Sequence, residues 1–134
     1  KREGFQEIFV VFDHDNQAKR DEAFKLALDK KIKVIFSSIC FESWFLFHFK
    51  NSTKAFASEE VLEKELKKCT GMENYEKNDF KHYSILKDKL NIAKSNAENI
   101  RLSVIENNYG VAIFNLNPYT NVDELVLFLE NQRA

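Results

Sequence analysis

Hydrophobic and polar positions follow two different patterns in the first forty residues of the chain. Residues 8–12 form a continuous run of β-branched and aromatic side chains, which predicts a strand over 6–12 that is covered on both faces. Over 17–29 the apolar positions recur at helical spacing among charged residues, which predicts an amphipathic helix. A second apolar run predicts a strand over 32–36. Strand, helix and strand within about thirty residues indicate a βαβ unit with parallel strands.

The middle of the chain has the pattern of helices. Ser37 and Ser38 are residue types that can cap a helix, and the very apolar segment 39–49 that follows is predicted to be helical. A polar connection leads to a helix that begins at Ser58 and stops before Gly71. The longest helix is expected after a further loop. Its apolar side chains recur at steps of three and four: Tyr83, Leu86, Leu90, Ala93, Ala97, Ile100 and Val104.

The last part of the chain is less clear. Residues 111–116 fit either a short strand or a buried loop, and Thr120 with Asp123 resembles a capping box before a final helix. The apolar stripe of that helix is Val122, Leu125, Val126 and Leu129. Two clear strands make a poor sheet, because a strand covered on both faces needs neighbours. We therefore expect an α/β fold with a small, mostly parallel sheet flanked by helices.

The domain organisation is expected to be simple. No repeat, low-complexity segment or linker divides the sequence, so residues 1–134 are predicted to form a single domain. The chain begins at Lys1 rather than at Met. Together with the shortage of strands, this start predicts a fragment of a longer chain that lacks an N-terminal strand of the sheet.

Composition and charge exclude several classes of protein. A hydrophobic fraction of 44% with 31% charged residues is that of a globular protein and not of a disordered one. The net charge of −1 gives no general attraction for nucleic acid, so such binding requires a local patch. No apolar run approaches the ~18 residues that span a membrane. Cys40 and Cys69 lack metal-type spacing, and we expect free thiols in a reducing cytoplasm.

Two carboxylates follow the first predicted strand. Asp13 and Asp15 stand where a parallel α/β sheet binds its ligands, outside the carboxyl ends of the strands. Two close carboxylates repel each other unless a cation lies between them, and such pairs are typical of Mg²⁺ or Mn²⁺ sites. Aspartates are also common in ordinary turns after strands. The pair alone is therefore weak evidence for a metal site.

Glu42 strengthens the case for a site at these strand ends. It follows the second strand within a segment that is otherwise almost wholly apolar. A buried carboxylate without a partner costs several kcal/mol. The partner can be a metal ion shared with Asp13 and Asp15, a buried Lys or Arg, or the amides at the start of its own helix.

Other polar side chains are weaker candidates. Lys77 and Tyr75 lie in a polar loop from which they can reach a phosphate, although a solvated lysine is the simpler interpretation. His48 and the aromatic residues around it fit a hydrophobic core better than a metal site or a base-stacking surface, since stacking requires exposure. His14 and His82 are expected to be exposed.

Two segments together resemble the RloB-like family. Its hallmark is a V-F-D-x-D strand end followed by an S-N-x-x-F-E-x-W-x-L-x-H-F segment, which match residues 10–15 and 37–49. Shorter matches are a Y-x-K at 75–77 and an N-P-x-T-x-V at 117–122, so the resemblance covers residues 8–129. The family is similar to Toprim-type domains, which occur in topoisomerases, primases and nucleases.

The resemblance implies a function and a set of site residues. It implies Mg²⁺- or Mn²⁺-dependent cleavage of phosphodiester bonds in DNA or RNA, by a cytoplasmic protein of bacterial anti-phage defence that is often encoded beside an ATPase. By position, Asp13 and Asp15 match the Toprim D-x-D, and Glu42 matches the F-E of the RloB segment. Ser38 and Lys77 are the candidate substrate-binding residues.

Two departures from the family pattern leave alternatives open. Ser38 stands where the family usually has Asn, and no C-E-G-x-x-T-E-like stretch with the further Toprim glutamate precedes Asp13. A metal-dependent nuclease domain is the first hypothesis. The second is a non-catalytic Toprim-like module that regulates a partner ATPase, and a nucleotide-binding domain is the third. Whether the chain forms a homodimer stays open.

Overall fold

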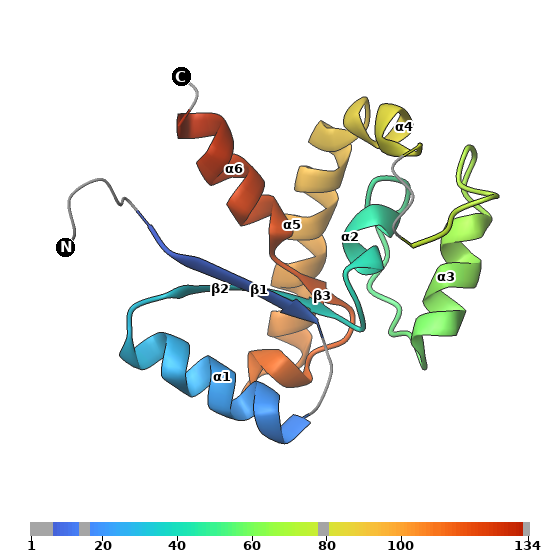
Figure 1. Ribbon diagram of the computed structural model, residues 1–134. Coiled ribbons are helices and arrows are strands. Elements are labelled where there is room, and N and C mark those ends of the chain that lie inside the picture. Colours follow the sequence, from blue (N-terminus) through green and yellow to red (C-terminus); the bar gives the residue numbers. More distant parts are fainter. Residues whose placement is uncertain (1–6, 14–16, 78–80, 133–134) are drawn as a thin grey trace.

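The elements of the fold follow the order β1-α1-β2-α2-α3-α4-α5-η1-β3-α6 (Figure 1). A computed structural model describes residues 7–13, 17–77 and 81–132 of the chain. The strands are β1 (Phe9–Asp13), β2 (Lys33–Ser38) and β3 (Tyr119–Thr120). The helices are α1 (Gln17–Asp29), α2 (Glu42–Leu46), α3 (Glu59–Lys67), α4 (Tyr83–Lys87), α5 (Leu90–Asn107), the 3₁₀ turn η1 (Ile113–Asn115) and α6 (Val122–Gln132).

The sheet is small and mixed. β1 pairs with β2 in parallel, with Asp13 opposite Ser37, so the predicted βαβ unit is confirmed. β2 pairs on its other side with β3, which runs antiparallel and places Tyr119 opposite Ser38. The described strands therefore form one parallel and one antiparallel pairing, and the expectation of a mostly parallel sheet is not confirmed. No sequence pattern indicated β3, because only two residues pair.

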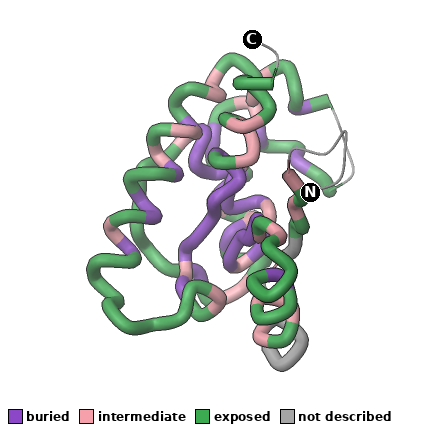
Figure 2. Tube along the Cα trace, turned by 90° about the vertical axis from the view of Figure 1, so that its left-hand side faces the viewer, coloured by how far each residue is buried: buried purple, intermediate pink, exposed green. Residues whose placement is uncertain are grey.

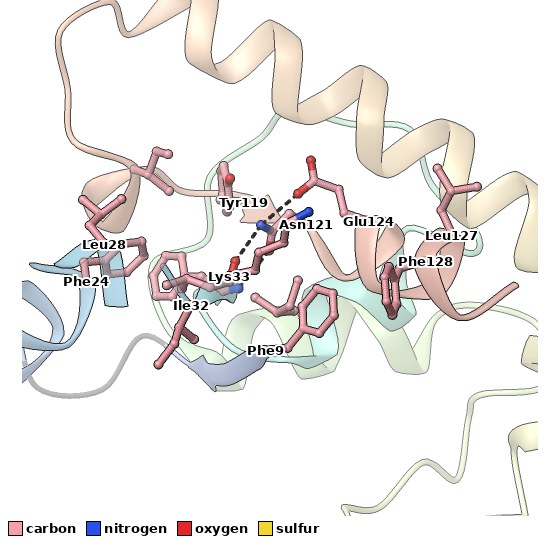
Figure 3. Close-up of a pocket in the computed structure, with 14 residues that line it drawn as sticks. Phe9, Phe24, Leu28, Ile32, Lys33, Tyr119, Asn121, Glu124, Leu127 and Phe128 are labelled. Atoms are coloured by element: carbon pink, nitrogen blue, oxygen red, sulfur yellow. Dashed lines mark hydrogen bonds between the residues drawn. The ribbon is translucent and has the colours of Figure 1, made fainter. Parts of the chain in front are cut away.

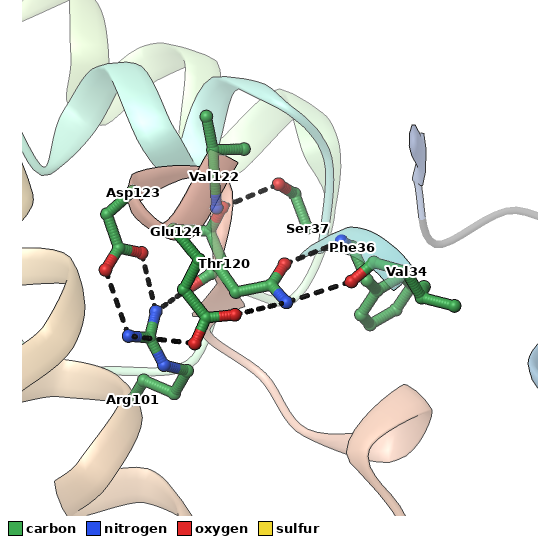
Figure 4. Close-up of polar contacts among 9 residues, drawn as sticks. Val34, Phe36, Ser37, Arg101, Thr120, Val122, Asp123 and Glu124 are labelled. Atoms are coloured by element: carbon green, nitrogen blue, oxygen red, sulfur yellow. Dashed lines mark hydrogen bonds and ion pairs between the residues drawn. The ribbon is translucent and has the colours of Figure 1, made fainter. Parts of the chain in front are cut away.

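A side chain continues the pairing of β2 where β3 ends. The backbone N–H of Phe36 donates to Asn121 Oδ1 at 2.8 Å, and Asn121 Nδ2 donates to the backbone oxygen of Val34 at 3.0 Å (Figure 4). Both bonds satisfy backbone groups that a longer third strand would otherwise pair. The amide of Asn121 therefore takes the place of a strand residue at this edge of β2.

The hydrophobic core lies beside β2, which is the central strand. Figure 2 shows the buried residues gathered in the interior, with exposed residues along the outer sides of the helices. In Figure 1, α1 lies below the strands and α6 above them, while α2, α3 and α4 gather beyond the end of β2. The largest fully buried hydrophobic side chains are Phe36, Phe47, Ile35, Leu62, Leu66, Met72 and Ile100. In the described part of the chain, no helix is long and apolar enough to cross a membrane.

β1 is correctly predicted as a strand, but its predicted burial is wrong. Ile8, Val10 and Val11 are 53%, 38% and 50% exposed, whereas Ile35 on β2 is only 1% exposed. β1 lies at the edge of the sheet, and no other described strand pairs with its outer side. The continuous apolar run predicted cover on both faces, which an edge strand of this sheet does not have.

The two strands are therefore expected to differ in their contributions to stability. Ile35→Ala removes a fully buried side chain from the core, which lowers the free energy of unfolding by about 2–5 kcal/mol. Val11→Ala removes a half-exposed side chain and is expected to cost less than about 1 kcal/mol. Urea denaturation of both variants measures the difference. Equal losses of unfolding free energy in the two variants would show that other protein atoms cover the Val11 side chain in solution.

The segment 39–49 is much less helical than predicted. Only α2, over Glu42–Leu46, is α-helical, and Ser37 and Ser38 belong to β2 instead of capping a helix. The residue before α2 is Phe41, which has no side-chain cap. Tight i to i+3 bonds flank the helix, such as Ser43 N–H to Cys40 O at 3.0 Å. Such 3₁₀-type bonds suit short turns and do not extend into a long helix.

The remaining helix predictions are partly right. α1 has the predicted bounds, although Leu28 on its apolar face is 76% exposed. α3 begins at Glu59, one residue after the predicted start, and Ser58 caps it, because its Oγ accepts from Val61 N–H at 3.2 Å. The predicted long helix is interrupted between α4 and α5, and Tyr83 at its start is exposed. The later apolar positions of that helix are buried as predicted: Ala93, Ala97, Ile100 and Val104.

The C-terminal predictions need two corrections. Residues 111–116 contain neither a strand nor a plain loop, but the short 3₁₀ turn η1. The predicted capping box is wrong, because Asp123 lies in the first turn of α6 and binds Arg101 at 2.6 Å. Thr120 Oγ1 instead accepts from Val122 N–H at 3.3 Å. Along the stripe of α6, Val122 is buried and Leu129 is exposed.

Candidate carboxylate site at the strand ends

The predicted site residues that the structure describes lie at one end of the sheet. Asp13 is the last residue of β1, Ser38 is the last residue of β2, and Glu42 is the first residue of α2. The parallel register of β1 and β2 brings Asp13 opposite Ser37, next to Ser38. Asp15 lies outside the described residues. The strand-end position that the sequence predicted for Asp13 and Glu42 is thus the position that they occupy.

Glu42 is buried and has a hydrogen-bonding partner. The hydroxyl of Tyr75 donates to Glu42 Oε2 at 2.6 Å, and both side chains are buried. Tyr75 belongs to the loop that follows α3, thirty-three residues further along the chain. The sequence suggested a metal ion, a basic side chain or helix amides as partners of Glu42, and considered Tyr75 only as a phosphate contact. The tyrosine was therefore identified, but with a different role.

The environment of Glu42 keeps neighbouring acidic groups protonated. Burial, and then the hydrogen bond to Glu42, raises the pKa of the Tyr75 hydroxyl. Burial also raises the pKa of the Cys40 thiol to about 12, with the charge of Glu42 and a hydrogen bond to Glu42 adding to the effect. Both groups are therefore protonated at neutral pH and can donate hydrogen bonds toward the carboxylate.

Cys40 is accordingly expected to be chemically inert in the folded protein. A thiol with a pKa of about 12 is only about one part in ten thousand thiolate at pH 8, and the thiolate is the reactive form. Cys69 is also buried with a raised pKa, caused mainly by burial. We expect reaction with a disulfide reagent at pH 8 to be slow in buffer and rapid for both thiols in urea. Rapid modification of Cys40 in the native protein would contradict this environment.

Lys77 faces the same site from the loop that carries Tyr75. The negative charge of Glu42 is the main cause that raises the pKa of Lys77, and Glu59, Cys40 and Asp13 add to it. The ammonium group of this exposed lysine therefore lies in the field of Glu42 and Asp13 together. A phosphate brought to this site would meet a positive charge, and the substrate-binding role of Lys77 stays a prediction.

Ser38 contributes a hydroxyl that is fully buried. Among the residues that the structure describes, its Oγ has no hydrogen-bond partner. The backbone oxygen of Ser38 is engaged, since Ser43 Oγ donates to it at 3.1 Å. A buried hydroxyl without a partner costs about 1–3 kcal/mol. Such a group beside the strand ends is suited to bind a ligand.

The donor atoms at the strand ends suit a hard divalent cation. Asp13 and Glu42 supply carboxylate oxygens, the ligand type that Mg²⁺ and Mn²⁺ take. Within 7–13, 17–77 and 81–132, no three His, Cys, Asp or Glu side chains come close enough together to hold a metal ion. Asp15, the third predicted ligand, is not among these residues. The predicted metal triad therefore stays a prediction.

The histidine predictions had mixed results. His48 is a core residue as predicted: its Nδ1 lies 2.9 Å from the backbone oxygen of Trp44, and burial lowers its pKa. His82 was expected to be exposed, which is wrong, because it is buried and its ring packs against Tyr75 with centroids 5.7 Å apart. His14 lies outside the described residues. Cys40 and Cys69 are free thiols, as expected.

A second hollow lies away from the carboxylates. A pocket of about 610 Å³ opens between α1, η1 and α6, and Phe9, Phe24 and Phe128 are among the side chains that line it (Figure 3). Two polar side chains in its wall are engaged with each other, since Asn121 Nδ2 donates to Glu124 Oε1 at 3.2 Å. The pocket is therefore mostly apolar and offers little for acid–base or metal chemistry. No sequence signal indicated it.

Comparison with known proteins identifies one family. The chain matches the family described as RloB-like protein over residues 1–129. The matched part contains both strand ends, α2 and the loop with Tyr75 and Lys77. No curated protein and no solved structure matches the chain.

Proposed function

This chain belongs to the RloB-like protein family, and from that membership and the strand-end site we propose that it is a divalent-metal-dependent nuclease domain. The observation that carries the proposal is the position of Asp13 and Glu42. Asp13 ends β1, Glu42 begins α2 shortly after the parallel strand β2, and the charges of both raise the pKa of Lys77. Carboxylates with a nearby lysine at the carboxyl ends of parallel strands are suited to bind a cation and a phosphate together.

The proposed roles follow from these positions. Asp13, Asp15 and Glu42 would hold Mg²⁺ or Mn²⁺, which stabilises negative charge on a phosphodiester during in-line displacement. Lys77 binds the phosphate through its ammonium group, and Ser38 donates its unpaired hydroxyl to a phosphate oxygen. Tyr75 fixes the orientation of Glu42 through the 2.6 Å hydrogen bond.

The proposal also includes the type of fold, the cellular role and the partners of the protein. The resemblance of the strand-end motif to the Toprim D-x-D supports a Toprim-like arrangement of the carboxylates. We propose a cytoplasmic role in bacterial defence against phages, with DNA or RNA as the substrate and an ATPase as a partner. What supports this role is the family membership.

A non-catalytic module that regulates a partner ATPase is the second candidate. One observation favours it: the net charge is −1, which gives no general attraction for nucleic acid. In this case the strand-end carboxylates have a structural or signalling role.

A cleavage assay separates the two candidates. Labelled RNA and DNA are incubated with the protein in Mg²⁺, Mn²⁺ or EDTA. We expect metal-dependent cleavage that falls by on the order of 10³-fold in the variant with both Asp13→Asn and Asp15→Asn. Glu130→Gln, a change in an exposed residue of α6, is the control. Cleavage that persists in the double variant would contradict the proposal, and metal-independent binding of the neighbouring ATPase would favour the second candidate.

A further inference from the structure

We infer that a small hollow between the end of α2 and helix α3 binds a backbone phosphate of the nucleic-acid substrate. The inference rests on the proposed function, because it names a surface on which that substrate lies. It uses side chains outside the strand-end site and needs no metal ion. It also supplies the local positive patch that a chain with a net charge of −1 requires for such binding.

The size of the hollow suits a phosphate group. Its volume is about 120 Å³, and most of its wall comes from the loop that joins α2 to α3. Its polar side chains are Lys50, Ser52, Lys54 and Glu65. One water molecule takes about 30 Å³ in the liquid, so the hollow holds a group of only a few heavy atoms. Pockets for whole ligands have about 300–1,000 Å³, and the sugar and base of a nucleotide therefore stay outside.

Lysines outnumber carboxylates around the hollow. Glu65 is the one carboxylate among the described side chains of its wall, and it accepts from Lys50 at 2.9 Å and from Lys68 at 3.3 Å. Lys54 also lines the hollow, and none of the ion pairs between described residues includes it. Three ammonium groups therefore surround a single negative charge, which leaves the hollow positive and attractive to a phosphate.

The loop that forms the hollow is held in place by side chains from distant parts of the chain. The backbone N–H of Phe56 donates to Asn117 Oδ1 at 3.2 Å, and Asn117 Nδ2 donates to the backbone oxygen of Phe56 at 2.7 Å. Nearer the start of the loop, Asn99 Nδ2 donates to Asn51 Oδ1 at 3.0 Å. A loop that is already ordered loses less entropy when a ligand binds. Asn117, the first residue of the N-P-x-T-x-V match, thus helps to shape this surface.

The other contacts in the hollow favour recognition of the backbone over recognition of bases. Ser52 Oγ accepts from the backbone N–H of Lys54 at 3.2 Å, and this bond does not use the hydrogen of the hydroxyl. Serine hydroxyls and lysines commonly donate to phosphate oxygens in nucleic-acid complexes. Phe47 and Phe56, the aromatic side chains of the wall, are buried and offer no surface on which a base can stack. We therefore expect binding that depends little on sequence.

Fluorescence anisotropy with labelled single-stranded DNA and RNA, measured in EDTA, tests the inference without any contribution from a metal ion. Lys54→Gln removes one ammonium group from the hollow. We expect the affinity at about 50 mM salt to fall by roughly threefold to tenfold, and the slope of log affinity against log salt to become less negative by about 0.7. Lys33→Gln is the matched control, because Lys33 begins β2 at the end of the strand away from α2. It should change neither quantity.

A second variant is expected to change the affinity in the opposite direction. Glu65→Gln removes the negative charge from the wall and releases Lys50 and Lys68 from their ion pairs. We expect the oligonucleotide to bind about threefold more tightly, because three ammonium groups then face the phosphate without a competing carboxylate. Weaker binding by Glu65→Gln would overturn the inference.

Three further results would also show that the inference is wrong. Equal losses of affinity in Lys54→Gln and Lys33→Gln would mean that only the net charge matters. Unchanged affinity and slope in Lys54→Gln would mean that the hollow is not used. Inorganic phosphate that binds as tightly as the oligonucleotide would identify a free anion as the ligand.

The cleavage assay keeps this inference distinct from the function on which it rests. If cleavage depends on Asp13 and Asp15 while Lys54→Gln binds the oligonucleotide normally, the nuclease stands and the inference fails. If binding depends on Lys54 but no cleavage occurs with either metal, the inference stands and the proposed nuclease fails.

Discussion

Arg101→Met is expected to lower the free energy of unfolding by about 3–5 kcal/mol, the largest effect on stability that the structure predicts. Arg101 lies buried on α5, where its two terminal nitrogens donate to the Asp123 carboxylate at 2.6 and 3.0 Å (Figure 4). The same guanidinium donates to the backbone oxygen of Thr120 at 2.8 Å. Methionine fills most of the space of the arginine stem, but leaves the Asp123 carboxylate buried without its partner.

Urea denaturation measures this loss, and two further variants show its cause. Lys94→Met breaks the more exposed ion pair between Lys94 and Glu130, 2.8 Å apart, and should cost less than about 1 kcal/mol. Replacing both Arg101 and Asp123 by apolar residues should cost less than Arg101→Met alone, because no unpaired charge is left in the interior. A loss below about 1 kcal/mol for Arg101→Met would show that the pair is solvated.

The second large effect is expected at Glu42. Glu42→Gln keeps the shape of the side chain and an oxygen that can accept from Tyr75, but it removes the negative charge from the site. We expect Mn²⁺ affinity to fall by on the order of 100-fold with little change in the thermal unfolding temperature. Glu59→Gln is the matched control. Glu59 is exposed in the first turn of α3, and its charge also raises the pKa of Lys77.

The comparison of these two variants decides whether Glu42 is a ligand. If Glu59→Gln weakens Mn²⁺ binding as much as Glu42→Gln does, the effect comes from the general field around Lys77 and not from coordination. If Glu42→Gln leaves Mn²⁺ affinity unchanged, the role of the carboxylate is to accept the hydrogen bond from Tyr75 and not to bind a cation.

The parts of the fold that the sequence predicts are those with a local pattern. The apolar runs of β1 and β2 and the helical spacing of α1 are repeated signals within a few residues. β3 has no such signal, since two residues pair with β2 and the amide of Asn121 completes the edge. Long-range side-chain pairing of this kind leaves no periodic trace in a sequence.

The apolar run of β1 shows a different limit. It identifies a strand correctly, but it does not say how much of the strand the rest of the chain covers. The segment after β2 shows the same limit for helices, because its many aromatic residues pack as tight turns around the short helix α2. Burial and element length depend on tertiary contacts that the pattern does not contain.

The candidate site also combines features that the sequence predicts with features that depend on tertiary packing. The strand-end rule depends only on chain direction in parallel strands, and Asp13 does end β1 while Glu42 begins α2 after β2. That the two carboxylates share a site stays a prediction. The requirement that a buried carboxylate has a partner was also correct. The identity of that partner, Tyr75, depends on how a polar loop packs against α2, and the burial of His82 follows from the same packing.

A calorimetric titration with Mn²⁺ of the unmodified protein and of Asp13→Asn tests the central claim most directly. Asp13→Asn removes one strand-end charge and keeps the size of the side chain. The proposed site predicts saturable binding of Mn²⁺ to the unmodified protein and loss of that binding in the variant. Equal binding by both proteins, or no binding by either, would contradict a metal site at the ends of β1 and β2.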